Sequence, residues 1–179
     1  MDRIRLSKEI SYALRHAPER YGLHIDEDGW VDIDTLLQSL HKKDGWRKVD
    51  KYFLQEMVTQ SARQRFEIKD HKIRALYGHS RSLRITKEPH EPPEMLFHGT
   101  SRRSVQLIKK QGLHPRGRLY VHLSIDIETA QTVGMRHDIM PVVLKVLAKK
   151  AWNDGILFYR GSHEIWLSEN IPTKYVIVA

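Results

Sequence analysis

Three consecutive residues near the middle of the chain have the types and the spacing to bind an anionic ligand. His98, Gly99 and Thr100 end a short apolar stretch that reads as a buried strand, and a helical pattern follows at 101–111. Gly99 has no Cβ, so a ligand can approach its backbone. A capped helix start would add amide groups and a positive dipole end beside it. On this stretch alone, a hydrogen-bonded core histidine is the simpler interpretation of His98.

Other candidate groups lie on both sides of this stretch. His122 and Ser124 alternate with aliphatic residues at 119–123, so they share one face of a predicted strand. Arg15 and His16 occupy the last turn of a predicted N-terminal helix. Cations in that position also complement the helix dipole, which needs no functional role.

The chain lacks the motifs of several common enzyme classes. There is no glycine-rich dinucleotide fingerprint after a strand, no Walker loop, no G-x-S-x-G and no H-E-x-x-H. Cysteine is absent, which excludes disulfides and thiolate metal ligands, and the 11 histidines do not have metal-ligand spacing. We therefore expect no metal at the site.

The first part of the chain has the pattern of a winged helix. Apolar residues at helical spacing predict one helix that ends before Pro18 and two more that begin after Asp32 and Asp50. Alternating residues at 65–69 and 72–77, joined by a turn, predict a hairpin. Three helices followed by a hairpin is the element order of a winged helix.

Basic residues gather around this hairpin. Arg74 lies on its second strand, on the face opposite the apolar residues, and Lys72, His79 and Arg81 lie nearby. These last three are candidates for contacts with RNA phosphates. The simpler interpretation is that they are ordinary charges on the open face of a small sheet.

The second part of the chain predicts a sheet-rich lobe. A short helix is expected after Asp126, and further strands are expected at 142–147, 156–159, 164–167 and 175–178. The fold class is therefore α+β.

A proline-rich stretch at 88–93 separates the two parts and predicts a domain boundary. We expect a first lobe at 1–88, a linker at 89–94 and a second lobe at 95–179.

The composition is that of a soluble globular protein. Of the 179 residues, 40% are hydrophobic and 29% are charged, and no apolar run has membrane-spanning length. No signal peptide is evident, so we expect a cytoplasmic monomer with no membrane partner. The net charge of +8 favours an anionic partner such as a nucleic acid, although a merely basic surface is common.

Short stretches spread along the chain form an ordered set. They are LRHAPE at 14–19, DGWV at 28–31, IRA at 73–75 with GHS at 78–80, FHGT at 97–100, Arg118 with VHLS at 121–124, TA at 129–130, VG at 133–134 with RH at 136–137, and WL at 166–167. Together, in this order, they resemble the NAD-dependent RNA 2′-phosphotransferase family, often called tRNA 2′-phosphotransferases. The resemblance extends over nearly the whole chain.

The resemblance implies a fold and a reaction. The fold is an N-terminal winged-helix lobe joined to a C-terminal lobe of the ADP-ribosyltransferase type with a mixed sheet, and RNA would lie between them, facing NAD. The RNA 2′-phosphate, as left by tRNA splicing, would attack the nicotinamide ribose and expel nicotinamide, which gives an RNA-2′-phospho-ADP-ribose intermediate. The neighbouring ribose hydroxyl would then attack phosphorus and release ADP-ribose 1″,2″-cyclic phosphate.

The resemblance also implies roles for residues. Arg15, His16, Arg74 and Arg118 would grip the phosphate, since arginine forks match its oxygens two at a time and stay charged. His16 would also move a proton in the second step. The residues implied to contact NAD, the co-substrate, are His98, Gly99, Thr100, His122, Ser124 and Arg136.

Two departures from the family pattern keep alternatives open. Asp138 stands where glycine often follows the Arg-His pair, and Glu164-Ile165 stand where the family usually has Gly-Val. Ordinary ADP-ribosyltransferases often carry a catalytic glutamate on this strand. We expect Ile165 to fill the family's aliphatic position and Glu164 to face away.

If Glu164 points into the site instead, an ADP-ribosyltransferase acting on nucleic-acid ends or protein is the alternative. A third interpretation is a non-enzymatic winged-helix nucleic-acid binder with an inert second lobe.

Overall fold

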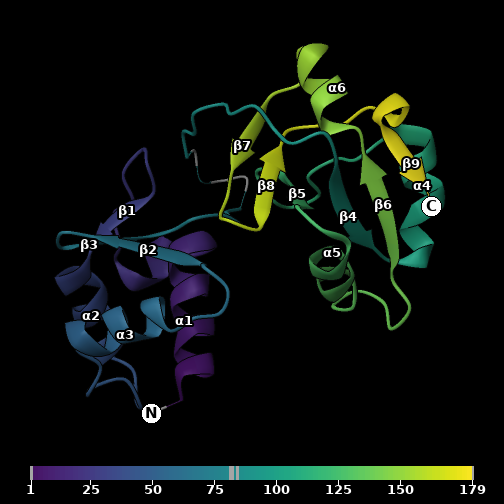
Figure 1. The fold of residues 1–179 in the computed structure, drawn as a ribbon. Coiled ribbons are helices and arrows are strands. Elements are labelled where there is room, and N and C mark those ends of the chain that lie inside the picture. The colour runs from purple at the N-terminus through teal and green to yellow at the C-terminus, as the bar shows by residue number, and fades with distance from the viewer. Residues whose placement is uncertain (1, 81–82, 84, 179) are drawn as a thin grey trace. The chain divides into compact units, whose positions relative to one another are not determined.

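The chain divides into two compact units, residues 1–86 and 87–179 (Figure 1). The structure is a computed structural model that describes residues 2–80, 83 and 85–178. Its helices and its two sheets make an α+β protein, as predicted. Arg81, one of the candidate RNA-binding residues, lies outside the described residues.

The first unit begins with a helix that ends just ahead of a proline. α1 (Arg3–Arg15) has its C-cap at His16, before Pro18, as predicted. The elements that follow are η1 (Pro18–Tyr21), β1 (Trp30–Asp32), α2 (Ile33–His41), α3 (Lys51–Thr59), β2 (Phe66–Lys69) and β3 (Lys72–Ala75). Asp32 and Asp50 accept bonds of 2.8 Å from backbone amides in the first turns of α2 and α3, which confirms the predicted helix starts.

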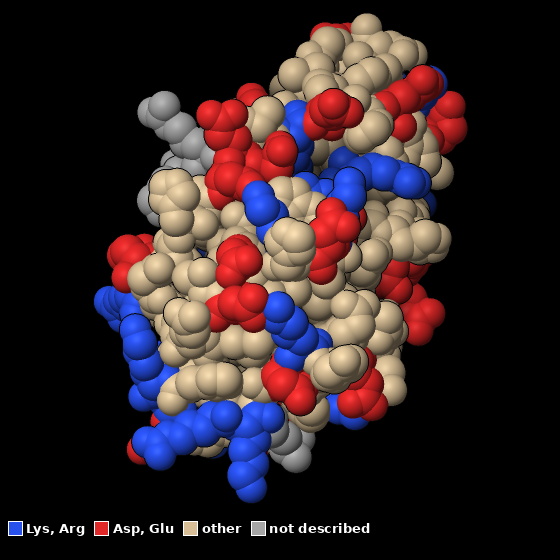
Figure 2. All heavy atoms as spheres, turned by 90° about the vertical axis from the view of Figure 1, so that its left-hand side faces the viewer, with Lys and Arg blue, Asp and Glu red and all other residues tan. Residues whose placement is uncertain are grey.

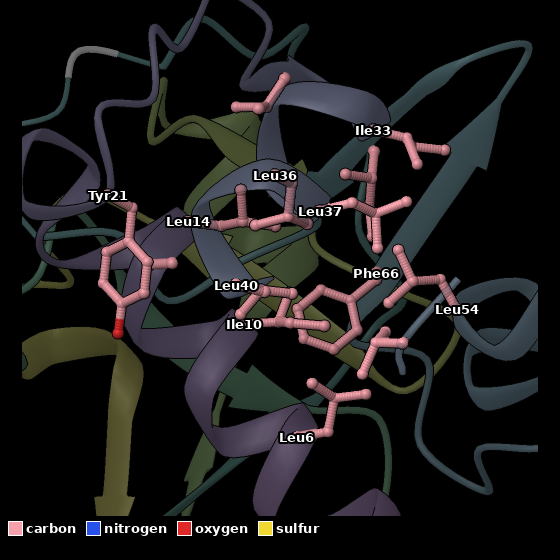
Figure 3. Packing of buried hydrophobic residues seen from close by; sticks show 14 of the residues in the cluster. Leu6, Ile10, Leu14, Tyr21, Ile33, Leu36, Leu37, Leu40, Leu54 and Phe66 are labelled. Carbon is pink, nitrogen blue, oxygen red and sulfur yellow. The ribbon is translucent and has the colours of Figure 1, made fainter. Parts of the chain in front are cut away.

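These elements enclose one core. The sheet has the order β1-β3-β2 and its pairs are antiparallel. Ile73 and Ala75 on β3 are at most 2% exposed, and alternation leaves Arg74 on the opposite face, as predicted. Figure 3 shows leucines from α1 and α2 packed around Phe66. This is the element order of the winged helix predicted above; the assignment to that fold family stays a prediction.

The second unit contains a six-stranded sheet. Its elements are β4 (Leu96–Thr100), α4 (Arg102–Gln111), β5 (Val121–Ser124), α5 (Ile127–Gly134), β6 (Val142–Val146), α6 (Ala148–Asn153), β7 (Phe158–Arg160), β8 (Ile165–Ser168), η2 (Thr173–Tyr175) and β9 (Val176–Val178). The strand order is β7-β8-β5-β4-β6-β9, and α5 packs against β4, β5 and β6 (Figure 1).

Three features of this unit differ from expectation. The sheet is not mixed, because each pairing between its named strands is antiparallel. Residue alternation has the same period in parallel and antiparallel strands, so it could not reveal strand direction. The helix α6 was not predicted, since six residues are too few for a clear helical period.

The third difference concerns the expected linker at 89–94, which is bound to the second unit. His90 donates a backbone bond of 2.8 Å to Phe158, Glu91 pairs with Lys149, and Pro89 forms a bridge with Tyr159.

None of the helices in the described part of the chain has the length and apolar character needed to span a membrane.

Candidate functional site

His98 occupies a place where two strands of the second unit separate. In the described sheet, β4 and β5 pair through a single register position, Phe97 opposite Ser124. Two residues before Ser124 on β5, the backbone carbonyl of His122 accepts a 2.9 Å bond from Nδ1 of His98. A carbonyl oxygen can only accept, so Nδ1 carries the proton and Nε2 of the neutral ring keeps its lone pair.

The surroundings favour the neutral form of this ring. Burial lowers the pKa of His98 from its usual value of 6.5, and the nearby His137 lowers it further. The bond to His122 opposes these effects without cancelling them. At neutral pH, Nε2 of His98 is therefore an acceptor suited to a hydroxyl donor.

Gly99 is required by helix packing. A Cβ at Gly99 would overlap the backbone carbonyl of Ala130 in α5. A Cβ at Gly134 would lie 3.3 Å from the Cα of Gly99 and 2.6 Å from the Cβ of Pro141. The two glycines thus allow α5 to lie directly on β4. The sequence analysis gave a different reason, the approach of a ligand, and that contact stays a prediction.

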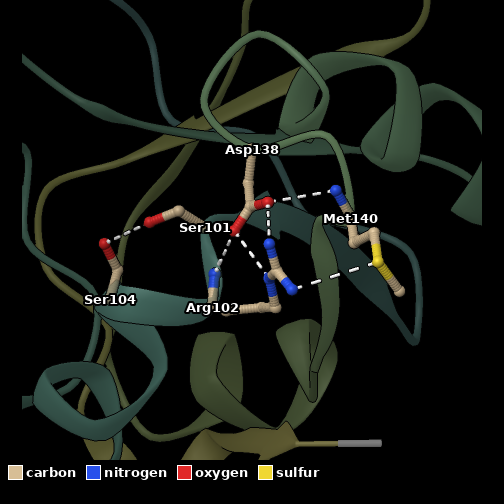
Figure 4. Close-up of polar contacts among 5 residues, drawn as sticks. All are labelled: Ser101, Arg102, Ser104, Asp138 and Met140. Carbon is tan, nitrogen blue, oxygen red and sulfur yellow. Dashed lines mark hydrogen bonds and ion pairs between the residues drawn. The ribbon is translucent and has the colours of Figure 1, made fainter.

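The first turn of α4 is occupied by a side chain of the protein itself (Figure 4). Asp138 accepts bonds of 3.1 Å from the backbone amide of Arg102, 3.0 and 2.9 Å from its guanidinium, and 3.0 Å from the amide of Met140. Ser101, the N-cap residue, bonds instead to Ser104. Asp138 is therefore the anion bound at the first amide of α4, and an anionic ligand beside this helix start stays a prediction.

The remaining candidates of the second unit lie on or beside the same sheet. Thr100 and Ser124 are buried at 7% and 3% exposure, whereas Arg118, before β5, and Arg136, after α5, are exposed.

The strand register also bears on the two residues that depart from the family pattern. Ile165 lies opposite Ser124 across the β5–β8 pair, which puts it on the face shared by Ser124 and His122. Glu164 precedes this strand and its backbone carbonyl accepts a bond from Ile125. The register agrees with the aliphatic role predicted for Ile165.

Arg15 and His16 in the first unit are held by the hairpin and the turn after it. The guanidinium of Arg15 lies 5.7 Å above the Phe66 ring and 5.1 Å from the Tyr77 ring, and it donates to the carbonyl of Arg65. His16 is exposed, and its Nδ1 lies 2.8 Å from the hydroxyl of Ser80. These contacts fix Arg15 while leaving the His16 ring at the surface.

Arg74 is held between two neighbours on the open face of the small sheet. Its Nε and Nη2 lie 2.7 and 2.6 Å from Glu67 Oε2, its Nη1 donates to the carbonyl of Asp28, and its guanidinium lies 4.3 Å from the centre of the Trp30 ring. Glu67 and Trp30 are the residues opposite Arg74 on β2 and β1. The residue is thus rigidly placed, and the phosphate contact predicted for Arg74 would have to compete with Glu67.

Two candidate RNA-binding residues have partners inside the first unit. Lys72 is exposed and forms a 3.2 Å ion pair with Asp26. His79 is only 4% exposed and lies near Gly29. This burial favours a structural role for His79, and its contact with RNA stays a prediction.

Arg65, an arginine that the sequence analysis did not single out as functional, lies in the same part of the first unit as His16. Arg65 and His16 line the same groove on the first unit. Sequence alternation assigned Arg65 only to the start of a strand, and its nearness to His16 depends on folding.

Within the described residues, no three His, Asp or Glu side chains gather where they could hold a metal ion.

Comparison with known proteins decides the family. A profile of the RNA 2′-phosphotransferase, Tpt1/KptA family matches residues 1–170. The chain belongs to the RNA 2′-phosphotransferase family. A probable RNA 2′-phosphotransferase of Acetivibrio thermocellus is 55% identical over 98% of this chain and 97% of its own length.

Other relatives are more distant. A Bacillus thuringiensis protein of the same description is 48% identical over 97% of this chain and 94% of its own length. An Archaeoglobus fulgidus relative, probable RNA 2′-phosphotransferase 1, is 36% identical over 96% of this chain and 79% of its own length. As a member of the RNA 2′-phosphotransferase family, the chain is an enzyme whose substrate is RNA with a 2′-phosphate.

Proposed function

We propose that the chain removes an internal 2′-phosphate from RNA by transferring it to NAD. The family match over residues 1–170 carries this proposal. An oxygen of the 2′-phosphate attacks the anomeric carbon of the nicotinamide ribose, and the bond to nicotinamide breaks. The adjacent ribose 2″-hydroxyl then attacks phosphorus, and the RNA 2′-oxygen leaves with a proton. The products are nicotinamide, RNA with a 2′-hydroxyl and ADP-ribose 1″,2″-cyclic phosphate.

The state of the His98 ring supports a nucleotide sugar as the second substrate. A neutral imidazole whose Nδ1–H is already engaged presents Nε2 as an acceptor. Ribose hydroxyls are donors of the matching kind, so His98 would orient the sugar without introducing a positive charge beside a carbon that becomes cationic. The other proposed NAD contacts are Gly99, Thr100, His122, Ser124 and Arg136.

The arginines suit the second step more than the first. The nucleophile of the first step is already an anion, so that step needs alignment more than a base. The second step places additional charge on phosphate oxygens as one phosphoester replaces another. Arg15, His16, Arg74 and Arg118 are proposed to stabilise that charge, and losing one such donor typically costs about 10²–10³ in rate.

A product assay tests this function and separates it from its alternatives. The protein is incubated with NAD and an oligonucleotide that carries an internal 2′-phosphate. Release of ADP-ribose 1″,2″-cyclic phosphate is expected. A stable ADP-ribosylated oligonucleotide would indicate an ADP-ribosyltransferase instead, and salt-sensitive binding without nicotinamide release would indicate a non-enzymatic binder.

Variants of two arginines test in which of the two reaction steps these residues act. Arg74→Ala and Arg118→Ala are expected to slow the second step more than the first, so an ADP-ribosylated RNA should accumulate in a quenched time course. Consumption of substrate without any such accumulation would show that these residues do not act mainly in the second step.

A further inference from the structure

A groove runs along the exposed side of α1 in the first unit. It encloses about 630 Å³, and its opposite wall comes from the end of α3 and the segment that leads into β2. On α1 its lining residues lie at positions 3, 4, 7, 8, 11 and 12, and His16 at the C-cap lines it as well. This spacing is one helical face. From Ile4 to His16 the face is about 18 Å long, at 1.5 Å per residue.

We propose that this groove binds the stretch of RNA next to the 2′-phosphate, with a base stacked on Tyr12. The proposal rests on the proposed function, because His16, at one end of the groove, is one of the residues proposed to contact the phosphate. RNA continues on both sides of an internal 2′-phosphate, so a flanking strand must leave the site in each direction. At about 3.4 Å per stacked nucleotide, the groove can follow about five.

Charges along the groove suit a phosphate backbone. Lys8 and Arg65 line it, and among the described residues neither has a carboxylate partner within ion-pair distance. Arg3, towards the far end, pairs with Glu56 at 2.8 Å. On the face drawn in Figure 2, basic and acidic side chains are interleaved. Net charge therefore does not select the binding surface by itself, and the case for the groove rests on the residues that line it.

Tyr12 has the placement of a stacking platform. Its side chain is 41% exposed, and its ring centre lies 6.1 Å from that of His16. An edge contact with Tyr21 and a 3.2 Å bond from Arg20 to its hydroxyl hold the ring in place. Proteins that bind single-stranded RNA combine such exposed rings with a basic groove. A base of the flanking strand, beyond the dinucleotide that carries the 2′-phosphate, would therefore find Tyr12 about one helical turn from His16.

The test compares two substrates and matched variants. One substrate is a 2′-phosphorylated dinucleotide, and the other carries about five further nucleotides on one side, with both polarities made. Tyr12→Ala is expected to weaken binding of the long substrate about tenfold, measured by fluorescence anisotropy, and to leave the dinucleotide unchanged. Tyr12→Phe keeps the ring and should behave as the parent protein. An abasic flank should abolish the difference between Tyr12→Ala and the parent.

The charge on Lys8 is tested through salt dependence. Lys8→Ala should reduce the slope of log Kd against log salt for the long substrate by about one. Lys48→Ala removes an exposed charge outside the groove and should leave the slope unchanged. Thermal unfolding of each variant shows whether the fold is intact.

The outcomes separate the two proposals. If Tyr12→Ala and Lys8→Ala affect both substrates equally, or neither, the groove does not bind the flanking strand. If a peptide or duplex DNA competes for the groove better than single-stranded RNA, the assigned partner is wrong. If the dinucleotide itself yields no cyclic phosphate product with NAD, the proposed function fails, whatever the groove does.

Discussion

At the scale of single residues, the proton on His98 decides what this part of the second unit can bind. The bond to the His122 carbonyl holds the proton on Nδ1, and burial keeps the ring neutral. A core histidine and a ligand-binding histidine look alike in sequence. Here one ring nitrogen bonds to the carbonyl of His122 on the neighbouring strand, and the other is left as an acceptor.

The neutral state of His98 predicts a loss of stability in mild acid. Its pKa in the folded protein is below 6.5, the usual value, so the unfolded chain takes up the proton first. The stability that depends on neutral His98 is complete above about pH 6.5 and is lost as the pH falls through the folded pKa. Melting temperatures between pH 8 and pH 5 should fall less for His98→Asn than for the parent protein. An exposed histidine, tested as His163→Asn, serves as the control, and equal slopes for both variants would contradict the prediction.

The contact between Glu67 and Arg74 predicts that removing the charge of Glu67 strengthens substrate binding. Its carboxylate holds Arg74, and the proposed substrate phosphate must compete with it. Glu67→Gln keeps a hydrogen-bond acceptor but removes the charge, so RNA with a 2′-phosphate should bind up to about fivefold more tightly. Asp34→Asn, which removes an exposed carboxylate paired with Lys51, controls for the change in net charge. Weaker binding by Glu67→Gln alone would mean that orientation of Arg74 outweighs competition.

At the scale of elements, one carboxylate joins the start of α4 to the loop after α5. Asp138 bonds to Arg102 at the helix start and to Met140 within its own loop (Figure 4). The Arg102 guanidinium holds the pKa of Asp138 well below its usual range. The same loop carries Arg136, which is a proposed NAD contact, and His137, whose charge lowers the pKa of His98.

Asp138→Asn should therefore loosen this loop. We expect a lower melting temperature at pH 7 and faster hydrogen exchange of amides 135–140. A carboxyl with a lowered pKa stabilises the fold above its unfolded pKa of about 3.8, and this stability is lost as the pH falls through the folded value. The difference between variant and parent should thus shrink in strong acid. Glu128→Gln, at an exposed position of α5, is the charge control, and unchanged exchange in Asp138→Asn would contradict the inference.

Gly99→Ala tests the contact between α5 and β4. The added methyl would overlap the Ala130 carbonyl, which is backbone and cannot move aside as a side chain can. We expect a loss of about 1–3 kcal/mol or more in the free energy of unfolding, measured in denaturant. Gly45→Ala is a control with open space around the new methyl, where only the cost of its positive φ of 94° applies, about 1–2 kcal/mol. If Gly99→Ala costs less than this control, packing does not explain Gly99.

Sequence patterns predicted what is local and missed what depends on distant partners. The starts of α2 and α3 were predictable because Asp32 and Asp50 bond to amides three residues on. The role of Asp138 was not, because its partner Arg102 lies 36 residues away. The direction of the strands in the second unit was not predictable either, because residue alternation is the same in parallel and antiparallel strands. The chemistry proposed for the site rests on the ordered motifs, whereas the closeness of Arg65 to His16 could be seen only in the folded structure.

At the scale of the whole molecule, the chain is built from two cores. The cluster of the first unit includes residues from Leu6 to Ala75, and that of the second includes residues from Leu96 to Tyr175. The two clusters share no residue. This arrangement predicts that each unit carries the information for its own fold.

Residues 1–86 should therefore fold alone. The fragment contains a full helical and sheet core, and its end is tied back by a 2.9 Å bond from the Thr86 amide to Glu27. A chain of this size can bury enough apolar surface to fold without a partner. We expect a cooperative thermal transition by circular dichroism and a dispersed amide NMR spectrum. Leu36→Ala, at a position with 0% exposure, should lower the free energy of unfolding by about 2–5 kcal/mol in the fragment and shift the corresponding transition of the full chain. A fragment without a cooperative transition, beside a full chain that melts in one step, would mean that the second unit is needed to stabilise the first core.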